Sequence, residues 1–179
     1  MVYYFCHAVF INRNAAFKTP QITRKKLILK AVRIIDINSK HHQAVQDVLI
    51  ENGTIIKIDD NIEHQEAELI AIEDLHLSPS WFDPSVSFGE PGFEDRETLI
   101  NGVKTAGLNG FAQIGLNPNT NPVTDTQTGV RFAQQYNLSQ AVEVLPFGAL
   151  TKNSKGKDLA ELFEMHQAGA IAFTDYKQP

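Results

Sequence analysis

Two serines stand one residue apart in the stretch WFDPSVSFGEPG, which runs from Trp81 to Gly92 and has the pattern of the end of a buried strand that enters a loop. Ser85 and Ser87 follow Asp83 at a spacing where a metal-binding site would carry a pair of imidazoles. A neutral hydroxyl is a poor zinc ligand compared with an imidazole. The stretch therefore has the layout of a metal site without the side chains that hold a metal, and it raises the question of whether the chain performs chemistry.

The region after Ser78-Pro79, which must position this loop, alternates between predicted strands and helices. The apolar runs predict strands at 81–83, 111–116, 141–145 and 170–173, and helices at 95–108, 126–136 and 157–168. Asp95 is expected to cap the first helix. Three apolar residues of the third helix are expected to face inward: Leu159, Leu162 and Phe163. Strands that alternate with helices are typical of parallel β/α units.

The length of this region limits the architecture that it can form. A closed barrel of eight β/α units typically needs about 250 residues, and only about 100 of the 179 residues follow Pro79. Four units are therefore expected, either as an open parallel sheet or as the first half of a barrel. In both cases ligands bind beyond the carboxyl ends of the strands. The loops that meet this condition are 83–92, 117–122, 147–152 and 174–179.

The preceding residues predict a small antiparallel β unit. Strands are expected at 27–36, 47–51, 54–58 and 69–72. Asn52-Gly53 is a strong hairpin signal between the second and the third of them. We therefore divide the chain into a poorly ordered N-terminal extension at 1–25, a small β unit at 26–77 and a partial barrel at 78–179.

Composition and charge narrow the class of protein. The net charge of −5 argues against nucleic-acid binding, which needs a basic surface. The apolar run Val2–Ile11 is shorter than the roughly 20 residues that span a bilayer. The single Cys6 excludes an internal disulfide and fits a reducing compartment. We therefore expect a cytoplasmic protein with neither nucleic-acid nor membrane partners.

Two of the candidate loops carry a resemblance to a known family. FDPSVSFGEPGFEDRETL followed by LNPNTNPVTDT resembles the dihydroorotase branch of the cyclic amidohydrolases, in which the first barrel strand ends Asp-x-His-x-His-x-Arg-Glu-Pro-Gly and the second ends Met-Pro-Asn-Thr-x-Pro. GAIAFTD is similar to the fourth strand of that family. The resemblance covers residues 27–179. It implies an α/β fold in which a small N-terminal β-sandwich unit precedes the first four β/α units of an incomplete TIM-type barrel.

The resemblance also implies a reaction and its residues. In the family, two zinc ions hold a bridging hydroxide that attacks the carbonyl of a cyclic amide. By position, Asn119 would bind the substrate carboxylate and Asp175 would bridge the metals. Ser85 and Ser87 take the places of the two histidines, and Gly89 takes the place of an arginine that also anchors the carboxylate. The other histidines and the acid–base aspartate of the family belong to the second half of the barrel.

These replacements leave two hypotheses open. The first is a dihydroorotase-like protein of pyrimidine biosynthesis, zinc-dependent at the family level, whose hydrolysis of cyclic amides is impaired. The second is a non-catalytic scaffold subunit that forms a homo-oligomer or assembles with a partner such as aspartate carbamoyltransferase. Because a half barrel exposes a strand edge and apolar strand faces, we also expect these 179 residues to be a fragment or to need another chain.

Each candidate residue also has a purely structural explanation. Glu90-Pro91-Gly92 is a turn sequence, and Asn119 lies between two prolines where a turn is common. Asp175 at a strand end can simply anchor a loop. The histidines at 41, 42, 64, 76 and 166 are expected to be surface or packing residues rather than metal ligands.

Overall fold

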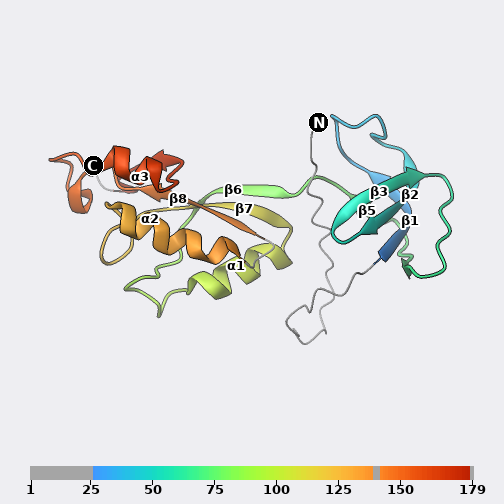
Figure 1. Cartoon of the computed structure of the whole chain (residues 1–179), viewed down its shortest axis with the longest axis horizontal. Coiled ribbons are helices and arrows are strands. Elements are labelled where there is room, and N and C mark those ends of the chain that lie inside the picture. Colours follow the sequence, from blue (N-terminus) through green and yellow to red (C-terminus); the bar gives the residue numbers. More distant parts are fainter. Residues whose placement is uncertain (1–25, 139–141, 178–179) are drawn as a thin grey trace. The chain divides into compact units, whose positions relative to one another are not determined.

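The chain is described by a computed structural model at residues 26–138 and 142–177, which form two compact units that divide between Ser80 and Trp81 (Figure 1). Each unit has a sheet of its own. The predicted extension at 1–25, with Cys6 and His7, lies outside the described residues.

The first unit is a mixed sheet. It consists of β1 (Lys26–Ile34), β2 (Val45–Glu51), β3 (Thr54–Asp59), β4 (Glu68–Ile70) and β5 (His76–Leu77). The order is β3-β2-β1-β4, and β5 also pairs with β1. The first three strands are antiparallel, but β4 and β5 run parallel to β1. The prediction of a purely antiparallel unit is therefore wrong, because the chain returns to β1 through crossover connections instead of hairpins.

Local chemistry and burial account for this sheet. Asn52 and Gly53 both have positive φ, at 51° and 78°, as the hairpin turn that matches strand twist requires. Asp47 is only 2% exposed, and it accepts hydrogen bonds from the backbone N–H groups of Ala31 and Ile62 and from Lys30. Apolar residues that alternate along β1 and β2 form the core of the unit: Leu29, Val32, Ile34, Val48 and Ile50.

The second unit alternates strands and helices, as the sequence predicts. Its elements in chain order are β6 (Trp81–Val86), α1 (Leu99–Leu108), β7 (Phe111–Leu116), α2 (Gln127–Gln134), the 3-10 turn η1 (Gln135–Leu138), β8 (Glu143–Gly148), the 3-10 turn η2 (Lys152–Ser154), α3 (Leu162–Gln167) and β9 (Ala172–Phe173). The four strands are parallel in the order β6-β7-β8-β9. This is the arrangement of an incomplete TIM-type barrel.

Helices α1 and α2 pack on the sheet through one continuous core (Figure 1). Leu99 and Val103 of α1 and Ala133 of α2 are buried against β7 and β8. Helix α1 begins after Thr98, whose hydroxyl accepts a hydrogen bond from the Asn101 backbone N–H. The prediction that Asp95 caps this helix is therefore wrong, because the loop from β6 stays irregular for three more residues.

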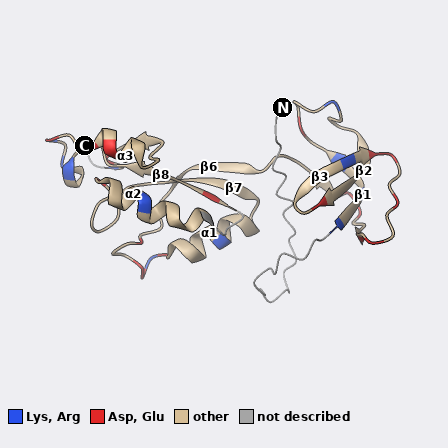
Figure 2. Ribbon diagram, in the orientation of Figure 1, with Lys and Arg blue, Asp and Glu red and all other residues tan. Residues whose placement is uncertain are grey.

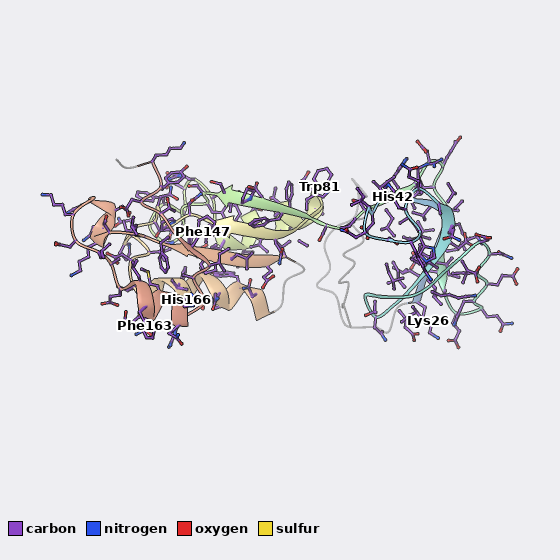
Figure 3. All side chains as sticks on the ribbon, turned by 90° about the horizontal axis from the view of Figure 1, so that it is seen from above. Lys26, His42, Trp81, Phe147, Phe163 and His166 are labelled. Atoms are coloured by element: carbon purple, nitrogen blue, oxygen red, sulfur yellow. The ribbon has the colours of Figure 1, made fainter. Side chains whose placement is uncertain are left out.

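The third helix is shorter than predicted and faces a different way. Leu159 is 63% exposed and Phe163, which is labelled in Figure 3, is 70% exposed, so the prediction that both face inward is wrong. Leu159 lies before the helix, in an isolated β-bridge to Thr151. Because this bridge holds the preceding segment extended, only Leu162–Gln167 is α-helical, and Met165 is its buried residue.

Two strands also extend further than predicted. Strand β6 continues to Val86 and is an edge strand, on which Trp81 is 61% exposed and Phe82 is 45% exposed, so the interpretation as a buried strand is wrong. Strand β8 includes Phe147 and Gly148, so the loop that follows it starts at Ala149. Charged side chains are sparse on β6, β7 and β8 and lie mainly on loops and helices (Figure 2).

Candidate functional site

The loops that follow β6 and β7 are packed against each other at the carboxyl ends of these strands. The backbone N–H of Asn121 donates a hydrogen bond of 2.8 Å to the carbonyl of Pro91. Gly92 has a φ of 95°, and a Cβ at this residue would lie 2.1 Å from the Asn121 carbonyl oxygen. Only glycine permits so close a backbone approach. Glycine at position 92 is therefore what allows these two loops to pack so closely.

Both serines, which stand at the positions that the resemblance assigns to histidines, are hydrogen-bonded to asparagines of the loop after β7. Asn117, which is 5% exposed, donates from Nδ2 to Ser85 Oγ at 3.0 Å. Asn119 donates from Nδ2 to Ser87 Oγ at 2.7 Å, and its Oδ1 lies 3.1 Å from the same hydroxyl, which donates to it. The hydroxyls are thus already engaged within the protein.

Arg96 joins this group from the loop before α1. Its Nη2 donates to Ser87 Oγ at 3.2 Å, and its guanidinium carbon lies 5.6 Å from the centre of the Phe93 ring. Within the described residues, Arg96 forms no ion pair with a carboxylate. We call the following five residues the serine–asparagine cluster: Ser85, Ser87, Arg96, Asn117 and Asn119.

The backbone at Gly89 is incompatible with an arginine. Its φ is 127°, a backbone conformation that residues other than glycine rarely adopt. A Cβ at this position would lie 2.5 Å from the backbone oxygen of Phe93, whose N–H donates to the Gly89 carbonyl at 3.0 Å. The Phe93 carbonyl therefore occupies the space into which a side chain at position 89 would start. Among the described arginines, Arg96 is the one that is hydrogen-bonded to Ser87.

Glu90 is more than a turn residue, because its carboxylate links two helical segments through hydrogen bonds. Its Oε2 accepts a hydrogen bond of 2.7 Å from the backbone N–H of Leu99, at the start of α1. A carboxylate at the start of a helix also interacts favourably with the helix dipole. Its Oε1 accepts a hydrogen bond of 3.2 Å from the Tyr136 hydroxyl. Partial burial and the neighbouring negative charge of Glu90 raise the pKa of Tyr136 above its usual value.

Asp175, which the resemblance predicts to bridge the metals, is hydrogen-bonded through both carboxylate oxygens to the loop after β8. Its Oδ1 accepts from the Thr151 backbone N–H at 2.9 Å, and its Oδ2 accepts from the Thr151 hydroxyl at 2.6 Å. Partial burial alone would raise the pKa of Asp175, but hydrogen bonds from Thr151, from the Leu150 backbone and from Ser154 lower it. Asp175 is thus an ionised anchor for the 149–156 loop.

The described residues do not fit a zinc centre. Zinc in proteins takes thiolate, imidazole and carboxylate ligands, whereas this site offers neutral hydroxyls and amides beside a guanidinium. In the described parts of the chain, no three His, Cys, Asp or Glu side chains are grouped so that they could hold a metal ion. Of the five histidines in the described ranges, four lie in the first unit and His166 lies on α3.

The structure brings some of the predicted site residues together and separates others. Ser87 and Asn119 touch, and they lie beyond the ends of successive strands or at their margins. No hydrogen bond among the described residues joins Asp175 to either of them. Three participants were missed by sequence reasoning: Asn117, Arg96 and Thr151. The position of Asn117 directly after β7 is a signal that could have identified it.

Comparison with known proteins places the chain among dihydroorotase relatives. Residues 76–178 match the family described as dihydro-orotase-like. The dihydroorotase of Aquifex aeolicus is 39% identical over 155 residues, and that of Pelotomaculum thermopropionicum is 36% identical over 155 residues. Each match covers 86% of this chain and 36% of the relative, so the chain spans about a third of the length of these relatives.

Two solved structures share the fold. An L-hydantoinase (dihydropyrimidinase) from Arthrobacter aurescens has a TM-score of 0.64 at 21% identity, over 84% of this chain and 32% of that protein. A dihydroorotase crystal structure has a TM-score of 0.58 at 11% identity, over 84% of this chain and 42% of that protein. Throughout residues 26–138 and 142–177, every helix is too short or too polar to cross a membrane. The chain, matched over more than half of its residues, belongs to the dihydroorotase-like family.

Proposed function

We propose that this chain is part of a dihydroorotase-like protein of pyrimidine biosynthesis in which metal-dependent hydrolysis of a cyclic amide is impaired. The observation that carries this proposal is the serine–asparagine cluster. Where the family resemblance places two imidazole ligands, Ser85 and Ser87 present hydroxyls that are hydrogen-bonded to Asn117 and Asn119. These hydroxyls are neutral, and a zinc site needs stronger donors.

The remaining positions support the same conclusion. Both carboxylate oxygens of Asp175 accept hydrogen bonds from Thr151, so metal binding would require this loop anchor to be released. Gly89 lacks the charged side chain of the family's substrate anchor, and its backbone leaves no room for one. Metal binding and carboxylate binding are separate functions, and the replacements affect both.

The test is a paired measurement of metal content and turnover. The purified chain and the dihydroorotase of Aquifex aeolicus would be dialysed against zinc, and both would be assayed for hydrolysis of dihydroorotate. We expect substoichiometric zinc and no turnover above background from this chain, whereas the relative serves as the positive control. Stoichiometric zinc together with turnover by this chain would refute the proposal.

A second candidate function is a non-catalytic scaffold subunit, and the exposed apolar residues of the second unit favour it. Trp81, Phe163 and Leu159 are each more than 60% exposed, so their apolar surface is available to a partner. Such a protein would form a homo-oligomer or assemble with aspartate carbamoyltransferase. Size-exclusion chromatography with light scattering, with and without purified aspartate carbamoyltransferase, tests this idea. A monomer that shows no shift with the partner would refute it.

A further inference from the structure

The sequence contains three Asn-Gly dipeptides, at 52–53, 101–102 and 109–110. An asparagine before a glycine can react with its own main chain, because glycine has no Cβ to shield its backbone nitrogen from the preceding side chain. In this reaction the glycine nitrogen attacks Cγ of the asparagine, and the amide nitrogen leaves. The reactivity of the three dipeptides therefore depends on whether the surrounding structure holds these two nitrogens.

The dipeptide at 101–102 lies within α1 and is held at both nitrogens. The backbone N–H of Gly102 donates to the Thr98 carbonyl at 2.9 Å. Nδ2 of Asn101 donates to both carboxylate oxygens of Glu97 at 3.0 Å. Gly102 is also buried. The reaction at Asn101 would therefore require part of α1 to unfold.

The dipeptide at 109–110 ends α1 and is also held at both nitrogens. Nδ2 of Asn109 donates to the Thr105 carbonyl at 2.8 Å, and the Gly110 N–H donates to the Gly107 carbonyl at 3.3 Å. The Gly110 carbonyl in turn accepts a hydrogen bond of 3.0 Å from the Trp81 N–H at the start of β6. Attack at Asn109 would therefore disturb the end of the helix and its link to the sheet.

The dipeptide at 52–53 forms the exposed turn between β2 and β3 and is held at neither nitrogen. The side-chain amide of Asn52 and the N–H of Gly53 form no hydrogen bond with any other described residue. A Cβ at Gly53 would have nothing within 4 Å, so the nitrogen is open to approach. Strand β3 is an edge strand, and the pair Glu51–Thr54 is the last of its ladder with β2. Opening this one pair frees the Asn52 backbone to rotate toward the attacking geometry.

We propose that Asn52 is a site of spontaneous deamidation, with water as the co-reactant. The bond between Gly53 N and Asn52 Cγ forms as the bond between Cγ and Nδ2 breaks, and the proton of the attacking nitrogen leaves with ammonia. Water then opens the resulting succinimide ring at either carbonyl, which gives aspartate or isoaspartate without a change of oxidation state. This inference is independent of the proposed function, because it concerns a turn in the first unit.

The isoaspartate product should weaken the hairpin. Its main chain runs through the former side-chain carbons, so one carbon is added to a turn whose two-residue length sets the register of β2 and β3. The amides of the pair Glu51–Thr54, next to the turn, should therefore lose protection from hydrogen exchange. The pair Val48–Ile58, farther along the same ladder, should keep its protection.

The experiment follows the three dipeptides in one sample. The purified chain would be kept for weeks in mildly alkaline buffer, with and without denaturing urea, and peptide mass spectrometry would quantify aspartate and isoaspartate at positions 52, 101 and 109. In the folded chain Asn52 should react roughly tenfold or more faster than Asn101 and Asn109, since a hairpin tip opens more readily than a packed helix. In urea the three rates should converge, because the structure that distinguishes them is lost.

Asn52→Gly is the matched control, since a Gly-Gly turn keeps the hairpin while the reactive amide is removed. In this variant the protection of Thr54 should not change on storage, whereas in the parent chain it should fall as product accumulates. If Asn101 or Asn109 reacts as fast as Asn52 in the folded chain, the assignment is overturned. It is also overturned if Asn52 stays intact over the time in which the urea-treated chain reacts fully. Unchanged protection of Thr54 in the isoaspartate fraction would overturn the predicted weakening of the hairpin.

Discussion

The hydroxyl of Tyr136 donates a hydrogen bond of 3.2 Å to Oε1 of Glu90, and this contact connects the loop after β6 with the turn that follows α2. The second carboxylate oxygen of Glu90 holds the first backbone N–H of α1. One side chain in the loop therefore joins two helical segments that cover the same face of the sheet. Its loss should be felt in the stability of the second unit rather than in ligand contacts.

The hydrogen bond between Tyr136 and Glu90 predicts that the free energy of unfolding depends on pH in the alkaline range. Because the folded state raises the pKa of Tyr136, the folded protein holds this proton more tightly than the unfolded chain does. The resulting stability is present below the usual tyrosine pKa of about 10 and is lost as the pH rises through the folded value. Tyr136→Phe should lower the free energy of unfolding by about 1 kcal/mol at pH 8 and reduce the fall above pH 10. Urea unfolding from pH 8 to 11 measures both effects, and a fall as steep in the variant as in the parent would contradict the assignment.

Gly89 predicts that the family's arginine cannot simply be restored. Gly89→Ala places a Cβ 2.5 Å from the Phe93 carbonyl oxygen at a φ of 127°, and it should cost about 2–3 kcal/mol. Gly53→Ala is the matched control, because it also has positive φ but no atom within 4 Å of the added Cβ, and it should cost about 1 kcal/mol. Thermal unfolding, followed by proton NMR signals from each unit, measures the loss of stability in the two variants. Equal losses would show that steric contact at Gly89 is unimportant.

The position of Arg96 predicts the outcome of rebuilding a metal site. A guanidinium in contact with residue 87 repels a divalent cation held there. Ser85→His with Ser87→His should therefore bind zinc weakly, and the further change Arg96→Gln should raise the affinity by roughly tenfold. Adding Arg131→Gln to the double variant instead is the control and should change little. Zinc titration against a competing chelator gives the affinities, and identical values with Arg96 or Gln at position 96 would contradict this electrostatic argument.

Asp47 predicts an acid-sensitive step in the first unit. Burial alone would raise its pKa, but hydrogen bonds from Lys30 and from the backbone of Ala31 and Ile62 lower it below the usual value. Its stability contribution is therefore complete above pH 3.8, the unfolded value, and is lost as the pH falls through the folded pKa. Asp47→Asn should cost about 2–3 kcal/mol near neutral pH, because it weakens three hydrogen bonds of a buried group.

Hydrogen exchange gives a direct readout of this carboxylate. The amides of Ala31 and Ile62 donate to Asp47, so both should exchange much faster in Asp47→Asn. Asp59→Asn, which removes an exposed partner of Lys57 in the same sheet, is the control and should leave these two amides protected. Unchanged protection of both amides in Asp47→Asn would show that the carboxylate does not support them.

The sequence was sufficient to predict the parallel unit and the loops that follow its strands. Strand ends in a parallel sheet lie along one edge, so the loops that contain Ser87 and Asn119 could be placed at the same edge from the sequence. Arg96 could not be placed in the same way, because the irregular segment between Gly89 and Thr98 has no periodicity that predicts its path. The contact of Asp175 with Thr151 likewise depends on the shape of a loop.

The errors in the helices have a related cause. Asp95 and Thr98 are both suitable N-caps, and the choice between them is made by Glu90, which holds the Leu99 N–H from nine residues earlier in the chain. Leu159 and Phe163 have helical spacing, but the bridge between Leu159 and Thr151 removes the first of them from the helix. In both cases a contact from outside the local window overrides the local pattern.

Because the backbone at Gly89 favours glycine, a substitution at this position would be tolerated only after the neighbouring loop had changed. An arginine that is replaced without any change in the backbone can be regained by one codon change. Here the backbone at position 89 has a conformation that favours glycine, so a single substitution would be strained. Reversal would first require Phe93 and its carbonyl to move, and each intermediate sequence would have to remain folded. The residue type at position 89 and the path of its loop therefore depend on each other, and a change in either one alone should be disfavoured.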